Sequence, residues 1–465
     1  MSALRTLSVA LAAVFVGACS LIPAYERPAA PVPAAFPEAP ASAPAVAPLA
    51  WRDYFADERL RAVIALALEN NRDLRVAALN IEKARAQYGI QRAELFPSLN
   101  ANAGLTAQRR QPAEGAAADA EPSTTRQYSA TLGFAAYELD FFGRLRSLGE
   151  QALELYLGSE EARRSAQISL VAEVSQAWLR LGADRERLAL AQETLASRRK
   201  SHELTQRSVE VGVASALDLA QSRTLLEGAR ADAARYAALV AQDRNALALL
   251  AGAPVPVELL PPSLTDSLAR VAELPAGLPS DVLQARPDIL QAERQLRAAN
   301  ANIGAARAAF FPRVTLTATA GSGSNTLDGL FDAGSGTWSF VPQIVLPIFH
   351  AGQLSANLEA SKVQREITLA QYEKAIQTGF REVADALAER ATLAEQLDAR
   401  RQLVAASAKS FELSEARYKA GVDSFLGLLD AQRALYGARQ ELIGARLSDA
   451  ANRVALYKAL GGGWQ

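Results

Sequence analysis

Two pairs of segments in this sequence resemble each other at nearly the same spacing. Residues 73–97 align with residues 288–312 without a gap, and 9 of 25 positions are identical. Residues 212–252 align in the same way with residues 421–461, with 14 of 41 positions identical. The spacings of 215 and 209 residues far exceed the period of about 20 to 50 residues that solenoid proteins show. The sequence therefore predicts an internal duplication with two large halves.

The composition favours long, closely packed helices. The chain has 465 residues, and its 49 Lys and Arg against 50 Asp and Glu provide no basic field for a nucleic acid. Half of the residues are apolar and only 6% are aromatic, and alanine, the strongest helix former, dominates the apolar set. No run of eighteen apolar residues follows the N-terminal segment, so we expect no membrane-spanning helix.

The N-terminus has the features of an export signal. After an arginine and an apolar stretch, the tetrad at 16–19 (VGAC) resembles the lipobox of bacterial lipoproteins. We therefore expect a signal peptide over residues 1–18 and a covalent lipid on Cys19, the only cysteine. Ser20 follows where an aspartate would favour the inner membrane, so the same resemblance implies an outer membrane anchor. The alternative is an ordinary signal peptide with an incidental cysteine. Residues 19–50, rich in Pro and Ala, predict an extended, lipid-anchored tether.

The rest of the chain divides into two repeats joined by a proline-rich linker. The first repeat spans residues 51–252, the linker 253–279 and the second repeat 280–465. Periodicity and helix breakers predict the same order in each repeat: a helix, a β-hairpin, a long helix and a shorter helix. In the first repeat these are residues 57–93, with a break at Asn70 or Asn71, then 97–140, 144–211 and 215–251. In the second repeat they are residues 280–309, 312–349, 353–420 and 424–460.

The two predicted hairpins have one apolar and one polar face. In the first hairpin the return strand alternates Tyr128, Ala130, Leu132, Phe134 and Ala136 with polar or small residues. Loops are predicted at 109–126 and 321–336, where Gly, Ser, Pro and Glu accumulate. This pattern is typical of membrane β-strands, but half-buried hairpins of soluble proteins show it too. Four strands cannot close a barrel, and lipid does not tolerate open edges. A membrane barrel would therefore need several chains.

Neither long helical segment contains a proline, so each could form one helix about 100 Å long. Gly212 and Gly421, which follow these segments, suit the left-handed residue that ends a helix. Ser215 with Asp218 three residues later resembles a capping box that starts the next helix. Leucines recur at coiled-coil spacing at positions 428, 435 and 442. In each repeat, the helix before the hairpin and the helix after the glycine turn are together about as long as the long helix. Stacked end to end, these two helices can run alongside it.

Several of these features together resemble a known family. They are the lipobox, the Phe-Pro pairs that precede each hairpin, the segment 417–435 (RYKAGVDSFLGLLDAQRAL) and the ending LYKALGGGW. They closely resemble TolC-like outer membrane factors, in particular the OprM-like lipoprotein branch of RND-type multidrug efflux. The resemblance covers essentially the whole mature chain. It implies an α+β membrane protein in which three times four strands close a trimeric twelve-stranded transmembrane β-barrel, continuous with a long periplasmic α-helical coiled-coil barrel.

The resemblance also implies a function and partners. The chain would be a passive homotrimeric duct in the cell outer membrane, lipid-anchored and with a large periplasmic extension. It would export drugs or other small molecules together with a periplasmic adaptor (membrane fusion) protein and an inner-membrane RND-type pump. No cofactor is implied beyond the covalent lipid at Cys19. In this picture the loops at 109–126 and 321–336 are extracellular, and the turns at Gly212 and Gly421 are the periplasmic tips.

A periplasmic gate is implied by residues near the second turn. Leu426 and Asp430 lie four residues apart and share a helix face, and Asp423 lies seven before Asp430 on roughly that face. In OprM-like proteins the matching positions of Leu426 and Asp430 narrow the opening, so three copies would form an apolar and an acidic ring. The alternative interpretation makes Leu426 a core residue, Asp430 a solvated surface charge and Asp423 an N-cap.

The residues just before that turn match family positions that hold the tips closed. By this resemblance Arg417 and Tyr418 form hydrogen bonds and salt links to neighbouring helices, with Asp218 and Asp423 as the candidate acids. The sequence leaves the choice between the two acids open. A solvated surface position for Arg417 is the alternative.

The tips themselves are predicted to contact the adaptor. Both turns carry the pattern Gly-Val-x-Ser-x-Leu, which presents two similar helical hairpins per chain. The adaptor-contact residues are Gly212, Val213, Ser215, Leu217, Gly421, Val422 and Ser424. A simple helix turn explains the glycine and serine equally well, so only the repeated Val and Leu favour a shared partner.

An enzyme is not expected from this sequence. His202 and His350 are isolated, no metal-ligand cluster occurs, and no Gly-rich phosphate loop follows a strand. Two alternatives to the efflux duct remain open: a periplasmic coiled-coil lipoprotein tether without a pore, and a type I protein-secretion duct. The hairpins with apolar faces disfavour the tether, and the lipobox disfavours the secretion duct.

Overall fold

The structure is a computed structural model that describes residues 20–36, 50–111, 123–264 and 280–462. The predicted signal peptide 1–18, Cys19, residues 37–49 of the tether and the second half of the linker lie outside the described residues. The chain forms two compact units. Unit 1 comprises residues up to 28, 81–159 and 292–372, and unit 2 comprises residues 29–80, 160–291 and 373–465.

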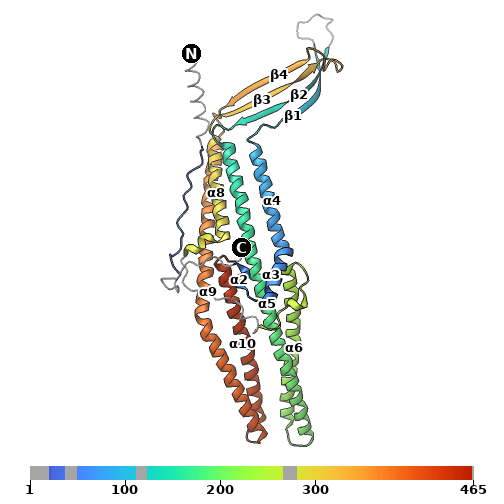
Figure 1. Cartoon of the computed structure of the whole chain (residues 1–465), viewed down its shortest axis with the longest axis vertical. Helices are drawn as coiled ribbons and strands as arrows, with labels where there is room; N and C mark the ends of the chain where they lie inside the picture. The colour runs from blue at the N-terminus through green and yellow to red at the C-terminus, as the bar shows by residue number, and fades with distance from the viewer. Residues whose placement is uncertain (1–19, 37–49, 112–122, 265–279, 463–465) are drawn as a thin grey trace. The chain divides into compact units, whose positions relative to one another are not determined.

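Unit 1 contains a four-stranded antiparallel sheet in the order β1-β2-β3-β4 (Figure 1). Its strands are β1 (Asn100–Arg110), β2 (Ser123–Leu139), β3 (Arg313–Ser324) and β4 (Gly336–Val345). The strands extend further than the alternation predicts. Strand β3 continues through Gly321 and Gly323, where the sequence predicts a loop. Gly321 pairs with Thr131, and a Cβ on Gly321 would lie 2.1 Å from the Ala130 carbonyl oxygen. Glycine here permits close approach of two strands and does not end the strand.

The predicted alternation along β2 is wrong at its last step because the strand contains a β-bulge. Phe134 pairs with Ala318, but Tyr137 pairs with Leu316, so two residues of β2 stand opposite Thr317. Ala136, one of these two residues, has a left-handed backbone, with φ 52°, and its amide donates to the Thr317 hydroxyl (3.0 Å). Tyr137, not Ala136, therefore shares a face with Phe134.

The helices follow the predicted order. They are α2 (Trp51–Tyr54), α3 (Glu58–Asn70), α4 (Arg72–Ala93), α5 (Arg144–Glu210), α6 (Ala216–Ala251), α8 (Pro287–Ala308), α9 (Gln353–Lys419) and α10 (Phe425–Ala459), with short 3-10 helices η1 (Val257–Leu259) and η2 (Ser280–Ala285). Helices α5 and α9 have 67 residues each. Where one helix is expected over 280–309, the structure has η2 followed by α8. No helix of the described ranges combines the length and the apolar character that a membrane span requires.

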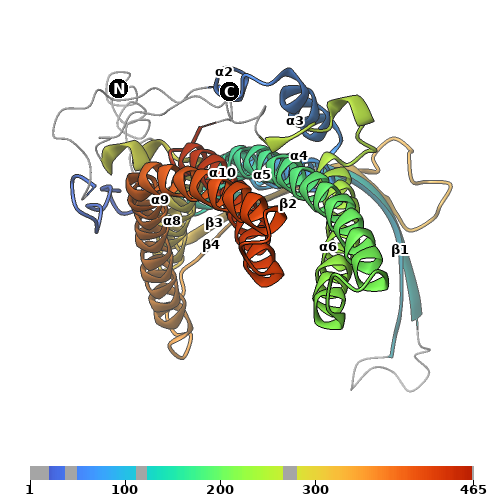
Figure 2. The same cartoon turned by 90° about the horizontal axis from the view of Figure 1, so that it is seen from below.

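In unit 2, α5 pairs with α6 and α9 pairs with α10, as Figures 1 and 2 both show. The aromatic rings of Tyr54 and Tyr457 stack there at 4.2 Å between centroids. The first part of the linker is packed and not a bare connection, because the Trp178 indole donates to the Leu259 carbonyl (2.9 Å) and Leu264 is fully buried. The part of the linker that follows α6 is therefore anchored on α5.

In unit 1 the described start of the tether lies against α8. The Asn300 amide donates to the Pro23 carbonyl (2.8 Å), and Arg27 forms an ion pair with Glu293 (2.6 Å). Burial alone would raise the pKa of Glu293, but hydrogen bonds from Arg27 and Arg297 lower it below its usual value. This part of the predicted tether is therefore docked on the protein surface.

Candidate functional site

The turn between α5 and α6 is built by hydrogen bonds around a left-handed glycine. The Gly212 amide donates to the Val209 carbonyl (3.0 Å) and the Val213 amide donates to the Ser208 carbonyl (2.8 Å). Gly212 has φ +79°, a conformation that costs little only for glycine. The two bonds form a Schellman motif, which satisfies the carbonyl groups at the end of α5.

The turn between α9 and α10 repeats this geometry. The Gly421 amide donates to the Tyr418 carbonyl (3.0 Å), the Val422 amide donates to the Arg417 carbonyl (3.0 Å), and Gly421 has φ +72°. Both turns belong to unit 2. The two predicted tips are therefore the same type of turn.

The helices that follow the turns begin differently. In α6, the Ser215 hydroxyl accepts from the Asp218 amide (3.1 Å), and the Asp218 carboxylate accepts from the Ser215 amide (3.0 Å). This is the predicted capping box. In α10, Ser424 is the N-cap but its side chain accepts no capping hydrogen bond, and the position three residues later is Gly427, which has no carboxylate to complete a box.

Asp423, just after the second turn, forms an ion pair with Arg417. Arg417 Nε and Nη2 donate to the two carboxylate oxygens of Asp423, at 2.5 and 2.9 Å. The hydrogen bond from Arg417 lowers the pKa of Asp423 below its usual value. Asp423 is therefore not the N-cap of α10. Asp218, the other candidate partner, belongs to the capping box of α6, so within one chain Arg417 meets Asp423.

Leu426 and Asp430 lie together on the exposed side of α10. Leu426 is 49% exposed, so it is not a core residue of the single chain. The Asp430 side chain is 62% exposed and pairs with Arg433 one turn further along (3.3 Å). An apolar and an acidic side chain thus stand one helical turn apart on a surface that the chain itself does not cover.

The opposite side of the same helical turns is buried. Phe425, Leu428 and Leu429 of α10 form an apolar cluster with Leu225 of α6, and Tyr418 of α9 packs against it. The Tyr418 ring lies 5.4 Å from that of Phe425. Tyr418 thus contributes packing here, and in the described part of the chain none of the predicted acids hydrogen-bonds to it.

The tips carry exposed apolar side chains. Val213 is 81% exposed and Leu217 65% in the first turn, and Val422 is 63% exposed in the second. Exposed apolar groups at matching positions of two turns mark a surface suited to a protein partner.

Two hydrogen bonds between α6 and α10 were not predicted. The Tyr436 hydroxyl donates to Asp232 (3.1 Å), and the Tyr236 hydroxyl donates to Gln440 (3.1 Å). Both bonds join residues 204 positions apart, which means that the two helices run side by side in the same direction. Burial, together with the negative charge of Asp232, raises the pKa of Tyr436 to about 12. The sequence signal for these bonds is a pair of polar residues four positions apart in each helix: Asp232 with Tyr236 in α6, and Tyr436 with Gln440 in α10.

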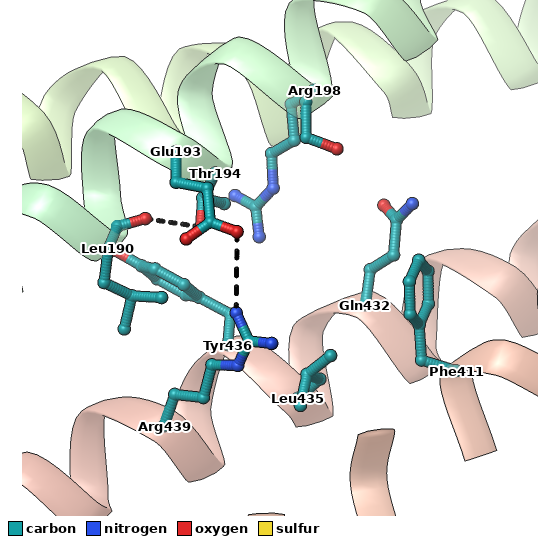
Figure 3. A pocket seen from close by; sticks show the side chains of 10 residues that line it. Leu190, Glu193, Thr194, Arg198, Phe411, Gln432, Leu435, Tyr436 and Arg439 are labelled. Atoms are coloured by element: carbon teal, nitrogen blue, oxygen red, sulfur yellow. Dashed lines mark hydrogen bonds and ion pairs between the residues drawn. The ribbon is translucent and has the colours of Figure 1, made fainter. Parts of the chain in front are cut away.

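A cavity of about 160 Å³ lies between α5, α9 and α10, and Tyr436 is part of its lining. Figure 3 shows Arg198 and Glu193 of α5 on one side and Tyr436 and Arg439 of α10 on the other. Arg439 approaches Glu193 at 3.8 Å. Arg198 is 8% exposed, lies over the Tyr436 ring at 5.2 Å and donates to the Leu225 carbonyl (3.0 Å).

The ranges that the structure describes hold no cluster of metal ligands. Within them no group of three or more His, Cys, Asp or Glu side chains is placed to hold an ion. His202, one of the two histidines, shares a hydrogen bond with the Ser222 hydroxyl (2.8 Å). This hydrogen bond joins α5 to α6.

Comparison with known proteins identifies the family. The family model described as "Outer membrane efflux protein" matches residues 63–253 and 278–462. The chain is 55% identical over 464 residues to "Probable efflux pump outer membrane protein TtgC" of Pseudomonas putida, covering 98% of this chain and 95% of TtgC. It is 45% identical over 459 residues to outer membrane protein OprJ of Pseudomonas aeruginosa, covering 98% and 95%. The crystal structure of the open state of the Neisseria gonorrhoeae MtrE outer membrane channel superposes with a TM-score of 0.86 at 42% identity, covering 96% of this chain and 99% of that one. This chain therefore belongs to the family of outer membrane efflux proteins.

Proposed function

We propose that this chain is the outer membrane channel of a tripartite efflux system. It acts as a passive duct for drugs or other small molecules, together with a periplasmic adaptor and an inner-membrane RND-type pump. The observation that carries this proposal is the family match, which extends over both halves of the chain. Relatives of high identity are named as efflux pump outer membrane proteins, and the matched MtrE structure is named as a channel. The proposed role is transport and involves no catalytic step.

The sheet supports a homotrimer with a twelve-stranded barrel. Its edge strands β1 and β4 have no second partner within the described sheet, and β4 exposes Trp338 (81%), Phe340 (58%) and Ile344 (70%). Unpaired edges and exposed aromatic rings are unfavourable in water, and open edges are unfavourable in lipid. Pairing of β1 with β4 of a neighbouring chain satisfies the edges and turns the apolar residues toward lipid.

The lipid anchor and the periplasmic extension complete the proposal. The lipobox supports covalent lipidation of Cys19 in the outer membrane. The docked segment that follows, ending in the Arg27–Glu293 ion pair, limits how far the anchor can move from unit 1. The long helices form the periplasmic part, and the duplication explains why the two tips share one geometry.

The gate is proposed at the exposed side of α10. Three copies of Leu426 form an apolar constriction and three copies of Asp430 form an acidic ring that favours cations. Both side chains are free of the buried cluster behind them, so they are available for this role. The Arg417–Asp423 pair closes the turn beside the gate, and the exposed Val213, Leu217 and Val422 receive the adaptor.

Single-channel conductance in a planar bilayer tests the function. The purified wild type is compared with the double variant Leu426→Ala, Asp430→Ala and with a matched control, Leu413→Ala, Glu412→Ala, two exposed residues of α9 before the turn. A small wild-type conductance that rises only in the gate variant supports both duct and gate. No conductance from a folded, oligomeric protein would contradict the duct, and a large conductance in all three would leave the duct and exclude this gate.

A further inference from the structure

We propose that the cavity between α5, α9 and α10 binds a small carboxylate with a single apolar ring, and that Arg198 holds its charge. The residues of the cavity come from three helices of unit 2 and are shown in Figure 3. The effect of such a ligand on the gate, described below, rests on the proposed function. The binding site itself does not.

The charge of the cavity favours an anion. Arg198 is buried, yet its contacts are a backbone carbonyl and the face of an aromatic ring, neither of which neutralises its charge. Asp232, whose charge is felt at Arg198, instead accepts from Tyr436 and pairs with Arg235 (3.2 Å). A second guanidinium, Arg439, shares the cavity with the single carboxylate of Glu193, at 3.8 Å. Two cations and one acid leave the site with a net positive charge.

The donors of Arg198 that remain open suit a carboxylate. A guanidinium has five N–H groups in a planar fork, and one nitrogen of Arg198 is occupied by the Leu225 carbonyl. Burial lowers the pKa of Arg198, which means that the protein environment opposes its charge. An anionic ligand would offset that penalty through charge-assisted hydrogen bonds.

The size and the remaining lining define the rest of the ligand. A cavity of about 160 Å³ is close to the roughly 150 Å³ in which a single benzene ring is accommodated. Leu190, Leu435 and Phe411 supply apolar surface, whereas Thr194 and Gln432 supply polar atoms. A benzoate-sized molecule therefore satisfies both the volume and the charge.

Occupancy of this cavity would strengthen the contact between α5 and α10. The ligand touches Arg198 on α5 and the helix of Tyr436 on α10, six residues after Asp430. A molecule that binds better when the two helices are close shifts the population toward that arrangement. If the proposed gate is correct and its opening separates α5 from α10, the ligand reduces opening of the channel.

The test uses 4-fluorobenzoate and fluorine NMR on the full-length protein in detergent. Its neutral analogue 4-fluorobenzamide has the same shape without the charge. We expect line broadening with the carboxylate and roughly tenfold to hundredfold weaker binding of the amide. Arg198→Met should weaken binding of the carboxylate by a similar factor. Arg199→Met, the same change at the exposed neighbouring residue, should leave binding unchanged.

A second variant covers the case in which Arg198→Met does not fold. Leu435→Trp fills the cavity and leaves both arginines in place, and it should also abolish broadening. Equal binding of the acid and the amide, or unchanged binding in Leu435→Trp, would overturn the site. Conductance with the probe present is a separate measurement: fewer openings in wild type but not in Leu435→Trp supports the effect on the gate. Binding without any change in conductance overturns that effect alone. If the protein is not a duct, conductance will be absent even without the probe.

Discussion

The Arg286 guanidinium donates a hydrogen bond to the Ala459 carbonyl (2.6 Å), and the Asn71 amide makes the matching bond to the Leu250 carbonyl (2.9 Å). The spacing of 215 residues in the first repeat pair, carried two residues before the aligned segments, places Asn71 opposite Arg286, and the alignment of the second pair places Leu250 opposite Ala459. In each half, therefore, the residue just before the helix that leads into the hairpin (α4 or α8) hydrogen-bonds to the last turn of the helix that follows the glycine turn (α6 or α10). Different side chains perform the same task, which supports the proposed duplication at the level of single contacts.

Replacement of Arg286 is expected to destabilise unit 2. Arg286 is 5% exposed and also pairs with Asp288 (2.7 Å) and Glu382 (2.8 Å). Arg286→Met leaves the Ala459 carbonyl and two acids without their donor, which should cost about 2 to 3 kcal/mol because the acids are partly exposed. Thermal unfolding followed by circular dichroism measures the loss. The exposed neighbour of Glu382 provides the control Arg381→Met, expected within about 0.5 kcal/mol of wild type; equal melting of both variants would contradict the prediction.

The two glycines after these helices should differ in their tolerance of alanine. Gly252 and Gly461 are both left-handed, at φ +67° and +75°, so alanine costs about 1 to 2 kcal/mol at either. A Cβ at Gly252 would also lie 2.2 Å from the Asn70 carbonyl oxygen, whereas at Gly461 it would lie 3.2 Å from a side-chain carbon of Arg286. Gly252→Ala should therefore lower the melting temperature more. Gly228→Ala in the interior of α6, where the Cβ meets nothing, should instead stabilise by about 0.5 to 1 kcal/mol, and destabilisation there would contradict the argument.

The sequence predicted the long helices well for a physical reason. The absence of proline over each stretch and a glycine after it are local signals, and α5 and α9 end within two residues of the expected positions. The capping box at Ser215 is equally local. The position of Cys19 lies outside the described residues, so its lipidation stays a prediction.

Features that depend on pairing between distant segments could not be predicted. The bulge at Ala136 depends on the register of β2 against β3. The Asp232–Tyr436 and Tyr236–Gln440 bonds need an offset of 204 between α6 and α10, which differs from the repeat spacing of 209. The cavity beside Arg198 follows from that same packing. The Arg417–Asp423 pair is local by contrast, and Asp423 is the partner because Asp218 is engaged by Ser215.

The two turns should respond independently to loss of their own acid. Asp423→Asn removes the pair with Arg417 and should speed backbone amide exchange at residues 420–424, while residues 211–215 exchange as in wild type. Asp218→Ala removes the carboxylate that accepts from the Ser215 amide in the capping box and should do the reverse, so each variant is the control for the other. Because Arg417 lowers the pKa of Asp423, the pair is complete above the unfolded value near 3.9 and is lost only as pH falls further. The effect should therefore be present at about pH 5 to 7 and shrink in about 1 M salt, since both groups are exposed. Faster exchange in both turns of one variant would contradict it.

A close pair of acids between α5 and α6, one buried and one half-buried, should make stability depend on pH. Asp184 is 4% exposed and accepts from Arg187 (2.7 Å), and one carboxylate oxygen of Asp243 is buried with no donor among the described residues. Burial, the hydrogen bond with Asp184 and its charge raise the pKa of Asp243 to about 6, against the weaker opposing effect of Arg180 and Arg187. A folded-state pKa above the unfolded value near 3.9 means that the folded protein retains this proton between about pH 4 and 6 while the unfolded chain has lost it.

Stability should therefore fall as pH rises from about 4 to 6 and then level off. The expected loss is on the order of 1 kcal/mol, discounted because Asp243 is partly exposed to solvent. Asp243→Asn keeps a hydrogen-bond donor toward Asp184 at every pH, so it should remove this slope and exceed wild type in stability at pH 7. Asp385→Asn, at an exposed position of α9, should preserve the wild-type slope. Denaturation of the three proteins at pH 4, 5, 6 and 7 measures the difference, and a parallel pH profile for wild type and Asp243→Asn would show that the proton is not held between Asp184 and Asp243.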